Sequence, residues 1–381
     1  MRDVVILGST GSIGRQGLEI IAANSDKFRV IAISSAGSNP ALVIEQAKRF
    51  NVAFVGVLNN ADLIRAELPG VKVIDGALAS TQIASIECDV VLNAITGSIG
   101  LGPTLAALDA GNTLALANKE SLVAGGELVM SKARENQIIP VDSEHSAIWQ
   151  CALAGKSDEI SRLVLTASGG PFLDRKDLGG ISVADALKHP TWSMGAVVTI
   201  NSATLVNKGL EIIEAHHLFS MPYSAIEAVI HRQSVVHSMV EFRDGSTIAQ
   251  ASPPNMKGAI AYALNFPHRL SKATPGIDWK ASHSWSFEPI DSQKFPAVAL
   301  ARHCGEIGGA MPAIFNAANE VAVEAFIDEK IVFTSIVPLI EAVLTLSEKS
   351  APSTLRELAD VSAIEDDARA IATELLQKVA R

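Results

Sequence analysis

The first 140 residues of the chain alternate short apolar runs with segments of helical spacing. Parallel strands cannot be joined by a tight turn, so this alternation is typical of strands connected by crossover helices. The pattern therefore predicts a parallel sheet covered by helices. The expected strands are Val4–Leu7, Val30–Ile33, Ala53–Val57, Val71–Ile74, Val90–Ala94, Thr113–Ala117 and Ile138–Val141.

The spacing changes near Asp142. Strand-like runs are now separated by longer segments that contain Gly and Pro, which indicates an α+β region. Residues 271–290 are polar with little periodicity and predict a linker, and the remainder has helical spacing. We therefore predict domains over 1–144 and 145–270, a linker over 271–290 and a helical domain over 291–381. The strands expected in the second domain are 163–167, 228–231, 234–241 and 247–251.

Composition narrows the possible partners. A formal charge of −10 without any basic run argues against nucleic acid, and it requires an anionic ligand to be held by local donors or a metal. Cys88, Cys151 and Cys304 form no CxxC motif, which argues against a disulfide framework and against a thiolate zinc site. No stretch suits a signal peptide or a membrane span, so we expect a soluble, cytoplasmic protein without a membrane partner.

A glycine loop follows the first predicted strand. Gly8-Ser-Thr-Gly11-Ser-Ile-Gly14 also opens a helical pattern, so its backbone N–H groups can hold a pyrophosphate at a helix N-terminus. This context predicts a Rossmann-like doubly wound sheet that binds a dinucleotide, although such a loop alone can be a mere turn. No acidic residue follows the second strand at Ser34–Asn39 to bond a ribose 2′-hydroxyl, which favours NADP over NAD.

The segment 201–211 places Asn207, Lys208 and Glu211 within one helical turn. Asn and Lys suit a phosphate, whereas a carboxylate so close repels it unless a cation lies between them. Asp142 and Glu144, after the strand at 138–141, are the candidates for further metal ligands, and we expect them to point one way in an extended segment. Alternatively, Asp142 and Glu144 are merely polar loop residues or helix caps. Lys208 and Glu211 can likewise be an incidental surface pair.

Other polar motifs have simple structural alternatives. Asn118-Lys119-Glu120 follows the strand at 113–117, at the carboxyl end where α/β sheets collect ligands. Ser168-Gly-Gly170 can be merely a turn and His189 merely a loop histidine, and we expect the pair His216-His217 at the surface.

Together these segments resemble the 1-deoxy-D-xylulose 5-phosphate reductoisomerase family of the non-mevalonate isoprenoid pathway. The motifs follow the family's order through the first two domains, and the helical end fits the family's third. The matching segments are Gly8–Gly14, Ala117–Ser121, Val141–His145, Ala167–Pro171, Lys188–Gly195 and Asn201–Glu211.

The resemblance implies a role for each matched residue. Thr10, Gly11, Ser12, Ile13, Gly37, Ser38, Asn39, Asn118, Glu120 and Gly195 would contact NADPH. Asp142, Glu144 and Glu211 would bind one divalent cation, Mn²⁺, Mg²⁺ or Co²⁺. Lys119, Ser143, Glu144, Ser168, His189, Ser202, Asn207, Lys208 and Glu211 would hold the substrate, with Lys119, Glu144, Glu211 and His189 acting at the reacting atoms. Ser38 departs from the family, in which a basic residue can stand there.

The segment Lys188–Gly195 is predicted to be a lid, because Trp192 and Met194 offer apolar surface without a regular period. The alternative is that Trp192 packs in the core.

The activity implied is the NADPH- and metal-dependent rearrangement and reduction of 1-deoxy-D-xylulose 5-phosphate, a ketose phosphate, to 2-C-methyl-D-erythritol 4-phosphate. The family also implies a homodimer. A simple NADP-dependent dehydrogenase of a hydroxy acid or polyol would instead need no metal. A non-catalytic NADP-sensing module would need no convergent acids in 142–211, and the clustered acids count against it.

Overall fold

The computed structural model describes residues 1–192 and 194–379. These residues form two compact units. The first comprises Met1–Ser121, Val129–Ser146 and Asn255–Pro275, and the second comprises Leu122–Leu128, Ala147–Pro254 and Gly276–Arg381. Within the described part of the chain, no helix has the length and apolarity that crossing a membrane requires.

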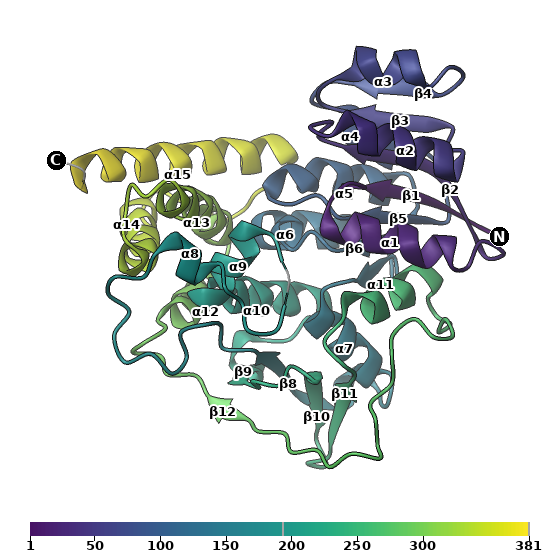
Figure 1. Ribbon diagram of the computed structural model, residues 1–381. Helices are drawn as coiled ribbons and strands as arrows, with labels where there is room; N and C mark the ends of the chain where they lie inside the picture. Colours follow the sequence, from purple (N-terminus) through teal and green to yellow (C-terminus); the bar gives the residue numbers. More distant parts are fainter. Residues whose placement is uncertain (193, 380–381) are drawn as a thin grey trace. The chain divides into compact units, whose positions relative to one another are not determined.

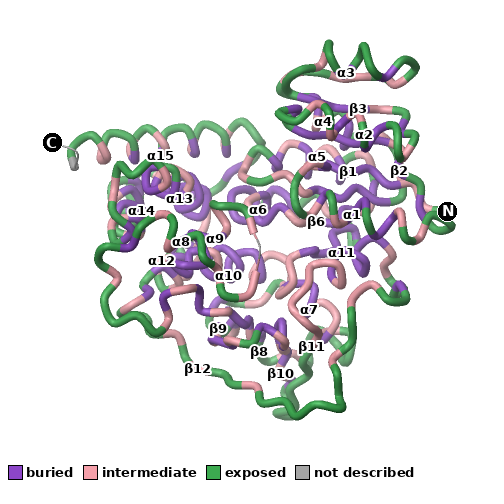
Figure 2. Tube along the Cα trace, in the orientation of Figure 1, coloured by how far each residue is buried: buried purple, intermediate pink, exposed green. Residues whose placement is uncertain are grey.

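The first unit is built on a parallel sheet of the described strands in the order β4-β3-β2-β1-β5-β6-β7 (Figure 1). The order reverses between β1 and β5, which creates the switch point where such sheets bind ligands. Of the two central strands, β5 is buried throughout and β1 is buried from Val4 to Leu7 (Figure 2). The strands are β1 (Arg2–Leu7), β2 (Phe28–Ser35), β3 (Phe54–Val57), β4 (Lys72–Asp75), β5 (Val90–Asn93), β6 (Thr113–Leu116) and β7 (Ile138–Pro140).

The connecting helices follow the strands in alternation. They are α1 (Ser12–Ala22), α2 (Pro40–Phe50), α3 (Ala61–Glu67), α4 (Ala79–Ala84), the turn η1 (Ser98–Gly100), α5 (Leu101–Asp109) and α6 (Glu120–Lys132). Helix α6 is kinked at Gly125, whose φ of −125° and ψ of 26° are not helical. Its residues Leu122–Leu128 belong to the second unit.

A helix from much later in the chain, α11 (Met256–Asn265), packs on α1 in the first unit. Lys257 forms an ion pair of 2.8 Å with Glu19 of α1. The Arg2 guanidinium donates hydrogen bonds to the carbonyls of Leu264 at 3.0 Å and Phe266 at 2.8 Å. These contacts tie the first strand to a segment that chain order places in the predicted second domain.

The second unit contains a mixed sheet in the order β11-β10-β8-β9-β12, in which only β8 and β9 run parallel among the described strands. Its strands are β8 (Ile160–Ala167), β9 (Ile226–Ile230), β10 (Val236–Phe242), β11 (Thr247–Ala251) and β12 (Glu288–Pro289). Its helices are α8 (Val183–Ala186), α9 (Ala196–Ala203), α10 (Val206–Phe219), α12 (Ala297–Ile307), α13 (Met311–Ile327), α14 (Ile336–Ser347) and α15 (Leu358–Val379), with short turns η2 (Ser157–Glu159), η3 (Tyr223–Ala225) and η4 (Phe333–Ser335). Helix α7 (Ser143–Ala152) begins in the first unit and ends in the second.

The predicted fold class is confirmed: a parallel sheet with helices, then a mixed sheet, then a helical region. Strands lie at or near the predicted positions: β5 is an apolar run buried along its whole length, whereas the edge strands β4 and β11 are largely exposed. The predicted linker contains the short strand β12, which pairs antiparallel with β9. The boundaries of the predicted domains stay a proposal.

His231 fastens this linker to the sheet. Its ring is fully buried, with Nδ1 at 2.9 Å from the carbonyl oxygen of Ser286. Nε2 accepts hydrogen bonds from the backbone N–H groups of Val235 at 3.1 Å and Val236 at 3.0 Å. The proton must therefore sit on Nδ1, which donates to the linker. Phe287 stacks on the ring with centroids 4.7 Å apart.

His231→Ala should lower the free energy of unfolding by roughly 2–5 kcal/mol, since each buried donor left without an acceptor costs about 1–3 kcal/mol. Chemical denaturation followed by circular dichroism measures the change. His303→Ala, at an exposed position on α12 of the same unit, is the matched control and should shift stability by less than about 0.5 kcal/mol. Equal stability of the two variants would refute the fastening role.

Candidate active site

The glycine loop packs closely against neighbouring backbone. Gly8 has a φ of +73°, and a Cβ on it would lie 2.5 Å from the carbonyl oxygen of Ala94, just after β5. A Cβ on Gly14 would lie 2.3 Å from the carbonyl oxygen of Gly8. Side chains at either position would therefore displace the loop at the switch point between β1 and β5.

The N-terminus of α1 is available to an anion. Gly11 is the residue before the helix, and no side chain caps the first turn. Thr10 to Ile13 are exposed or half-buried. The uncapped N–H groups and the positive end of the helix suit a phosphate.

The segment after β2 also depends on a glycine. Gly37 has a φ of +77°, and a Cβ there would meet the carbonyl oxygen of Asn59 at 2.2 Å. Ser38 and Asn39 are exposed. The Asn39 side chain accepts a hydrogen bond of 3.2 Å from the Leu42 N–H and so caps α2, which occupies one of its polar atoms.

Asn118 is fully buried and organises the loop after β6. Its amide nitrogen lies 2.8 Å from the carbonyl oxygens of Ile95 and Gly97, and 2.9 Å from the Glu120 carboxylate. Its oxygen accepts the Ser121 N–H at 3.0 Å. The side chain thus shapes the loop in which Lys119 stands.

Lys119 and Asp142 form a largely buried ion pair in the first unit. The Lys119 ammonium lies 3.0 Å from Asp142 Oδ2, with side chains 11% and 14% exposed. The buried ring of His145 places Nδ1 at 3.2 Å from Oδ1 of the same carboxylate. Sequence reasoning gave His145 no role, although its spacing three residues after Asp142 on a helix start was a usable signal.

The expected extended segment at Asp142–Glu144 is wrong. Helix α7 begins at Ser143, so Glu144 lies in its first turn. The Asp142 carboxylate accepts a hydrogen bond of 3.2 Å from the Glu144 N–H, an interaction that starts a helix rather than prolonging a strand. The Ser143 hydroxyl donates to the Glu144 carboxylate.

His189 joins two serines in the second unit. Its Nε2 lies 3.0 Å from Ser168 Oγ and 3.1 Å from Ser202 Oγ. Nδ1 accepts the N–H groups of Thr191 at 3.1 Å and Trp192 at 2.8 Å, so Nε2 carries the proton of the neutral ring. Burial lowers the pKa of His189, which favours this neutral form.

Asn207, Lys208 and Glu211 share one face of α10, as predicted. The Glu211 carboxylate contacts both the Asn207 amide and the Lys208 ammonium. The alternative of a surface pair is wrong, because the side chains of Lys208 and Glu211 are each only 2% exposed. A buried ion pair of this kind is uncommon outside functional or tightly specified sites.

The predicted lid remains untested, and its Ser193 lies outside the described residues. Trp192 is half-buried, with its ring centroid 6.1 Å from that of His237. Met194 is half-buried, and Gly195 precedes α9 with open space where a Cβ would stand.

The expectation that His216 and His217 lie at the surface is wrong. Both are partly buried at the end of α10, and their ring centroids lie 5.1 Å apart. Burial, together with the neighbouring His216, lowers the pKa of His217 to about 4. The covering residues come from α6 and η3, so the sequence around the pair could not reveal them.

Gly14→Ala should weaken NADPH binding by about tenfold or more, because its methyl group would collide with the backbone at Gly8. Fluorescence titration of NADPH measures this. Gly258→Ala, on α11 of the same unit, places its Cβ 3.5 Å from the nearest atom and should bind NADPH like the wild type. Wild-type NADPH affinity in the Gly14 variant would show that this loop does not bind the cofactor.

Three family descriptions match successive parts of the chain. They are 1-deoxy-D-xylulose 5-phosphate reductoisomerase over residues 4–126, its C-terminal domain over 138–219, and DXP reductoisomerase C-terminal domain over 251–371. A relative from Streptomyces avermitilis with the first of these names is 50% identical over 388 aligned positions, covering 99% of this chain and 98% of the relative.

Solved structures give the same picture. A reductoisomerase from Zymomonas mobilis in complex with NADPH matches with a TM-score of 0.91 at 40% identity, covering 98% of this chain and 99% of the other. A DOX-P reductoisomerase in complex with NADPH, fosmidomycin and magnesium matches with a TM-score of 0.94 at 38% identity, covering 100% and 99%. The resemblance inferred from the motifs is thus confirmed, and the chain belongs to the 1-deoxy-D-xylulose 5-phosphate reductoisomerase family.

Proposed function

We propose that this chain converts 1-deoxy-D-xylulose 5-phosphate to 2-C-methyl-D-erythritol 4-phosphate with NADPH and a divalent cation. The single observation that carries the proposal is family membership over nearly the whole chain at 50% identity. Related structures hold NADPH and magnesium, which are the two cofactors the reaction needs.

The first unit suits NADPH. The uncapped α1 N-terminus offers backbone donors to the pyrophosphate, and Thr10, Gly11, Ser12 and Ile13 are the residues we assign there. Gly37, Ser38 and Asn39 are assigned to the adenosine ribose, with Ser38 as an exposed hydroxyl for a 2′-phosphate. Asn118, Glu120 and Gly195 complete the proposed cofactor contacts.

The metal ligands we propose are Asp142, Glu144 and Glu211. Their carboxylate oxygens are the hard donors that Mg²⁺ and Mn²⁺ prefer. Lysines already balance two of these charges, at Lys119 for Asp142 and at Lys208 for Glu211. When bound, a divalent cation polarises a substrate carbonyl and balances negative charge that develops on oxygen.

The chain's own side chains would orient the substrate. We assign Ser168, His189, Ser202, Asn207 and Lys208 to its phosphate end. The Nε2–H of His189 and the two serine hydroxyls form a connected donor group, and Lys208 adds positive charge. Lys119, Ser143, Glu144 and Glu211 are assigned to the reacting end, and remote phosphate binding would help to orient that end.

The lid proposal concerns Trp192 and Met194. Nδ1 of His189 accepts hydrogen bonds from the N–H groups of Thr191 and Trp192. Movement of this segment would therefore move His189 too. Closing over the substrate would exclude water from the reaction.

We also propose a cytoplasmic homodimer. An aromatic cluster on the linker supports a second copy as partner, since Trp279 is 71% exposed and Trp285 lies 6.2 Å from it between ring centroids. Exposed aromatic side chains are enriched at protein interfaces. The sheet of the second unit also has a largely exposed edge strand, β11, which includes Ile248 and lies at the edge opposite β12. The cytoplasmic placement rests on three cysteines without a pairing motif.

NADPH oxidation should require both the ketose phosphate and a divalent cation. We expect EDTA to abolish the absorbance change and added Mn²⁺ or Mg²⁺ to restore it. NADH should be the poorer cofactor in kcat/KM. Oxidation that persists in EDTA would indicate a metal-independent dehydrogenase, and NADPH binding without turnover would indicate a sensing module.

Lys208→Ala should raise KM for the phosphorylated substrate more than it lowers NADPH affinity, because the phosphate loses its cation. Removing one partner of a buried ion pair also costs about 3–5 kcal/mol, so thermal unfolding must be recorded beside the kinetics. Lys208→Arg keeps the positive charge, so comparing it with Lys208→Ala separates an effect on folding from an effect on substrate binding. Lys330→Ala, with its side chain 64% exposed and outside the proposed site, is the control. An unchanged KM in folded Lys208→Ala would place the phosphate elsewhere.

Replacing Trp279 and Trp285 by Ser should shift the dimer toward monomer in light scattering, because the change removes apolar area from the proposed interface. Ile99→Ser is the control, since Ile99 is an apolar side chain of the other unit that is 77% exposed. A wild-type monomer, or a double variant that remains fully dimeric, contradicts the assignment.

A further inference from the structure

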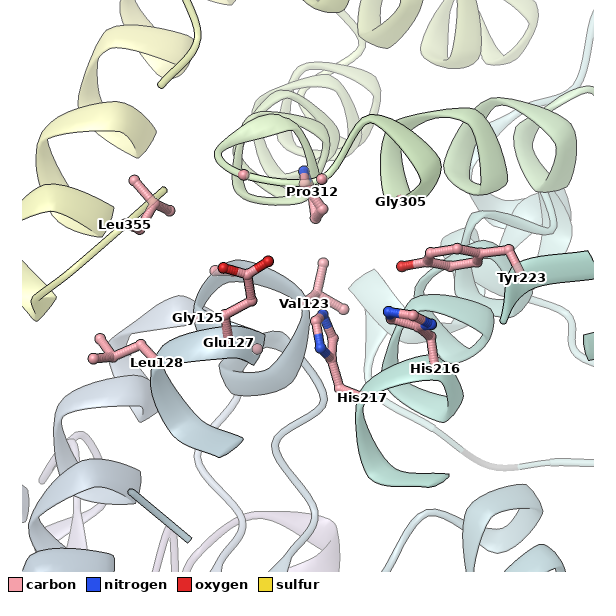
Figure 3. A pocket seen from close by; sticks show the side chains of 14 residues that line it. Val123, Gly125, Glu127, Leu128, His216, His217, Tyr223, Gly305, Pro312 and Leu355 are labelled. Atoms are coloured by element: carbon pink, nitrogen blue, oxygen red, sulfur yellow. The ribbon is translucent and has the colours of Figure 1, made fainter. Parts of the chain in front are cut away.

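The second unit contains a hollow that the proposed reaction does not use. Its lining comes from the kinked part of α6, the end of α10, η3 and the α12–α13 junction (Figure 3). The space open to the centre of a water molecule is about 50 Å³, whereas one water needs roughly 10–15 Å³ by that measure. The hollow therefore admits a few waters or a ligand of a few heavy atoms.

Polar atoms without protein partners face this space. Tyr223 is only 7% exposed, yet among the described residues no hydrogen bond to its hydroxyl is found. Figure 3 shows this hydroxyl and the Glu127 carboxylate directed toward the hollow. The ring nitrogens of His217 likewise have no hydrogen-bond partner in the described chain. The Tyr223 hydroxyl belongs to a side chain that is only 7% exposed, so water or a ligand in the hollow is left to complete it.

The lining offers acceptors and negative charge. His216 Nδ1 lies 2.7 Å from the carbonyl oxygen of Met221 and donates to it. The lowered pKa of His217 keeps its ring neutral, so one of its nitrogens is an acceptor. Glu127, an exposed residue at the edge of the lining, contributes a carboxylate, and neither Lys nor Arg occurs among the residues that line the hollow. Phosphates and carboxylates are therefore disfavoured here.

Two glycines leave the space that the His217 and Tyr223 rings occupy. A Cβ on Gly126 would lie 2.2 Å from His217 Nε2, and a Cβ on Gly305 would lie 2.4 Å from the Tyr223 hydroxyl. His216 stacks on Tyr223 at 4.3 Å between centroids with an interplanar angle of 17°. The side chains are thus positioned before any ligand arrives, which reduces the entropy cost of binding.

We propose that this hollow binds a small organic cation with a primary ammonium group. The ammonium would donate hydrogen bonds to the Tyr223 hydroxyl and a His217 nitrogen, and Glu127 would balance its charge. A preorganised metal site is the weaker alternative. In the described part of the chain, no three His, Cys, Asp or Glu ligand atoms of this hollow lie within 4.8 Å of one another.

Ethylammonium is the probe, titrated into the full-length protein at constant ionic strength. Binding is followed through the ring-proton NMR signals of His216 and His217, assigned by their loss in His216→Gln and His217→Gln variants. The best very small ligands gain about 1.5 kcal/mol per heavy atom. Ethylammonium should therefore bind no more tightly than a Kd on the order of 1 mM. Acetate, of similar size and opposite charge, should produce no saturable shift.

Tyr223→Phe keeps the ring that stacks on His216 and removes only the hydroxyl, so it should weaken ethylammonium binding about tenfold. Tyr262→Phe, which alters a buried tyrosine of the other unit, should leave binding unchanged. The proposal is overturned if ethylammonium gives no saturable shift, if acetate binds equally, or if Tyr223→Phe binds like the wild type. Saturable Zn²⁺ binding without an ethylammonium response would likewise overturn it in favour of a metal site.

Discussion

Burial of charge is the constraint on which the candidate site depends. A carboxylate removed from water is tolerated only when an opposite charge and hydrogen bonds compensate for its lost hydration. Glu211 meets this requirement through Lys208 and Asn207 on its own helix. Asp142 meets it through Lys119 and His145. In each unit the local fold thus brings a lysine to a proposed metal ligand.

Several polar side chains that the motifs marked as functional also hold the local structure. Asn118 uses its amide to fix the loop around Lys119, and Asn39 caps α2. His189 accepts two backbone N–H groups on one nitrogen, which fixes its tautomer and presents the other N–H to Ser168 and Ser202. Such residues position the site because their own orientation is already determined.

Sequence predicted the sheet strands and the grouping on α10, because both follow from local periodicity. It failed where a distant segment decides the outcome. The placement of α11 beside β1 and α1 brings Arg2 to the Leu264 carbonyl and Lys257 to Glu19, contacts that local patterns do not connect. The partial burial of His216 and His217 depends on α6 and η3. The extended segment expected at Glu144 failed for a local reason, since the Asp142 side chain caps the start of a helix.

We infer a role for the lysine-compensated carboxylates as ligands of a divalent cation. Its most direct test is a Mn²⁺ titration in which electron paramagnetic resonance counts the free ion. Glu211→Gln should weaken Mn²⁺ binding by about tenfold or more, because one charged oxygen ligand is lost. Glu227→Gln, at an exposed position on β9, should bind Mn²⁺ like the wild type. Equal Mn²⁺ affinity in wild type and Glu211→Gln would contradict the account.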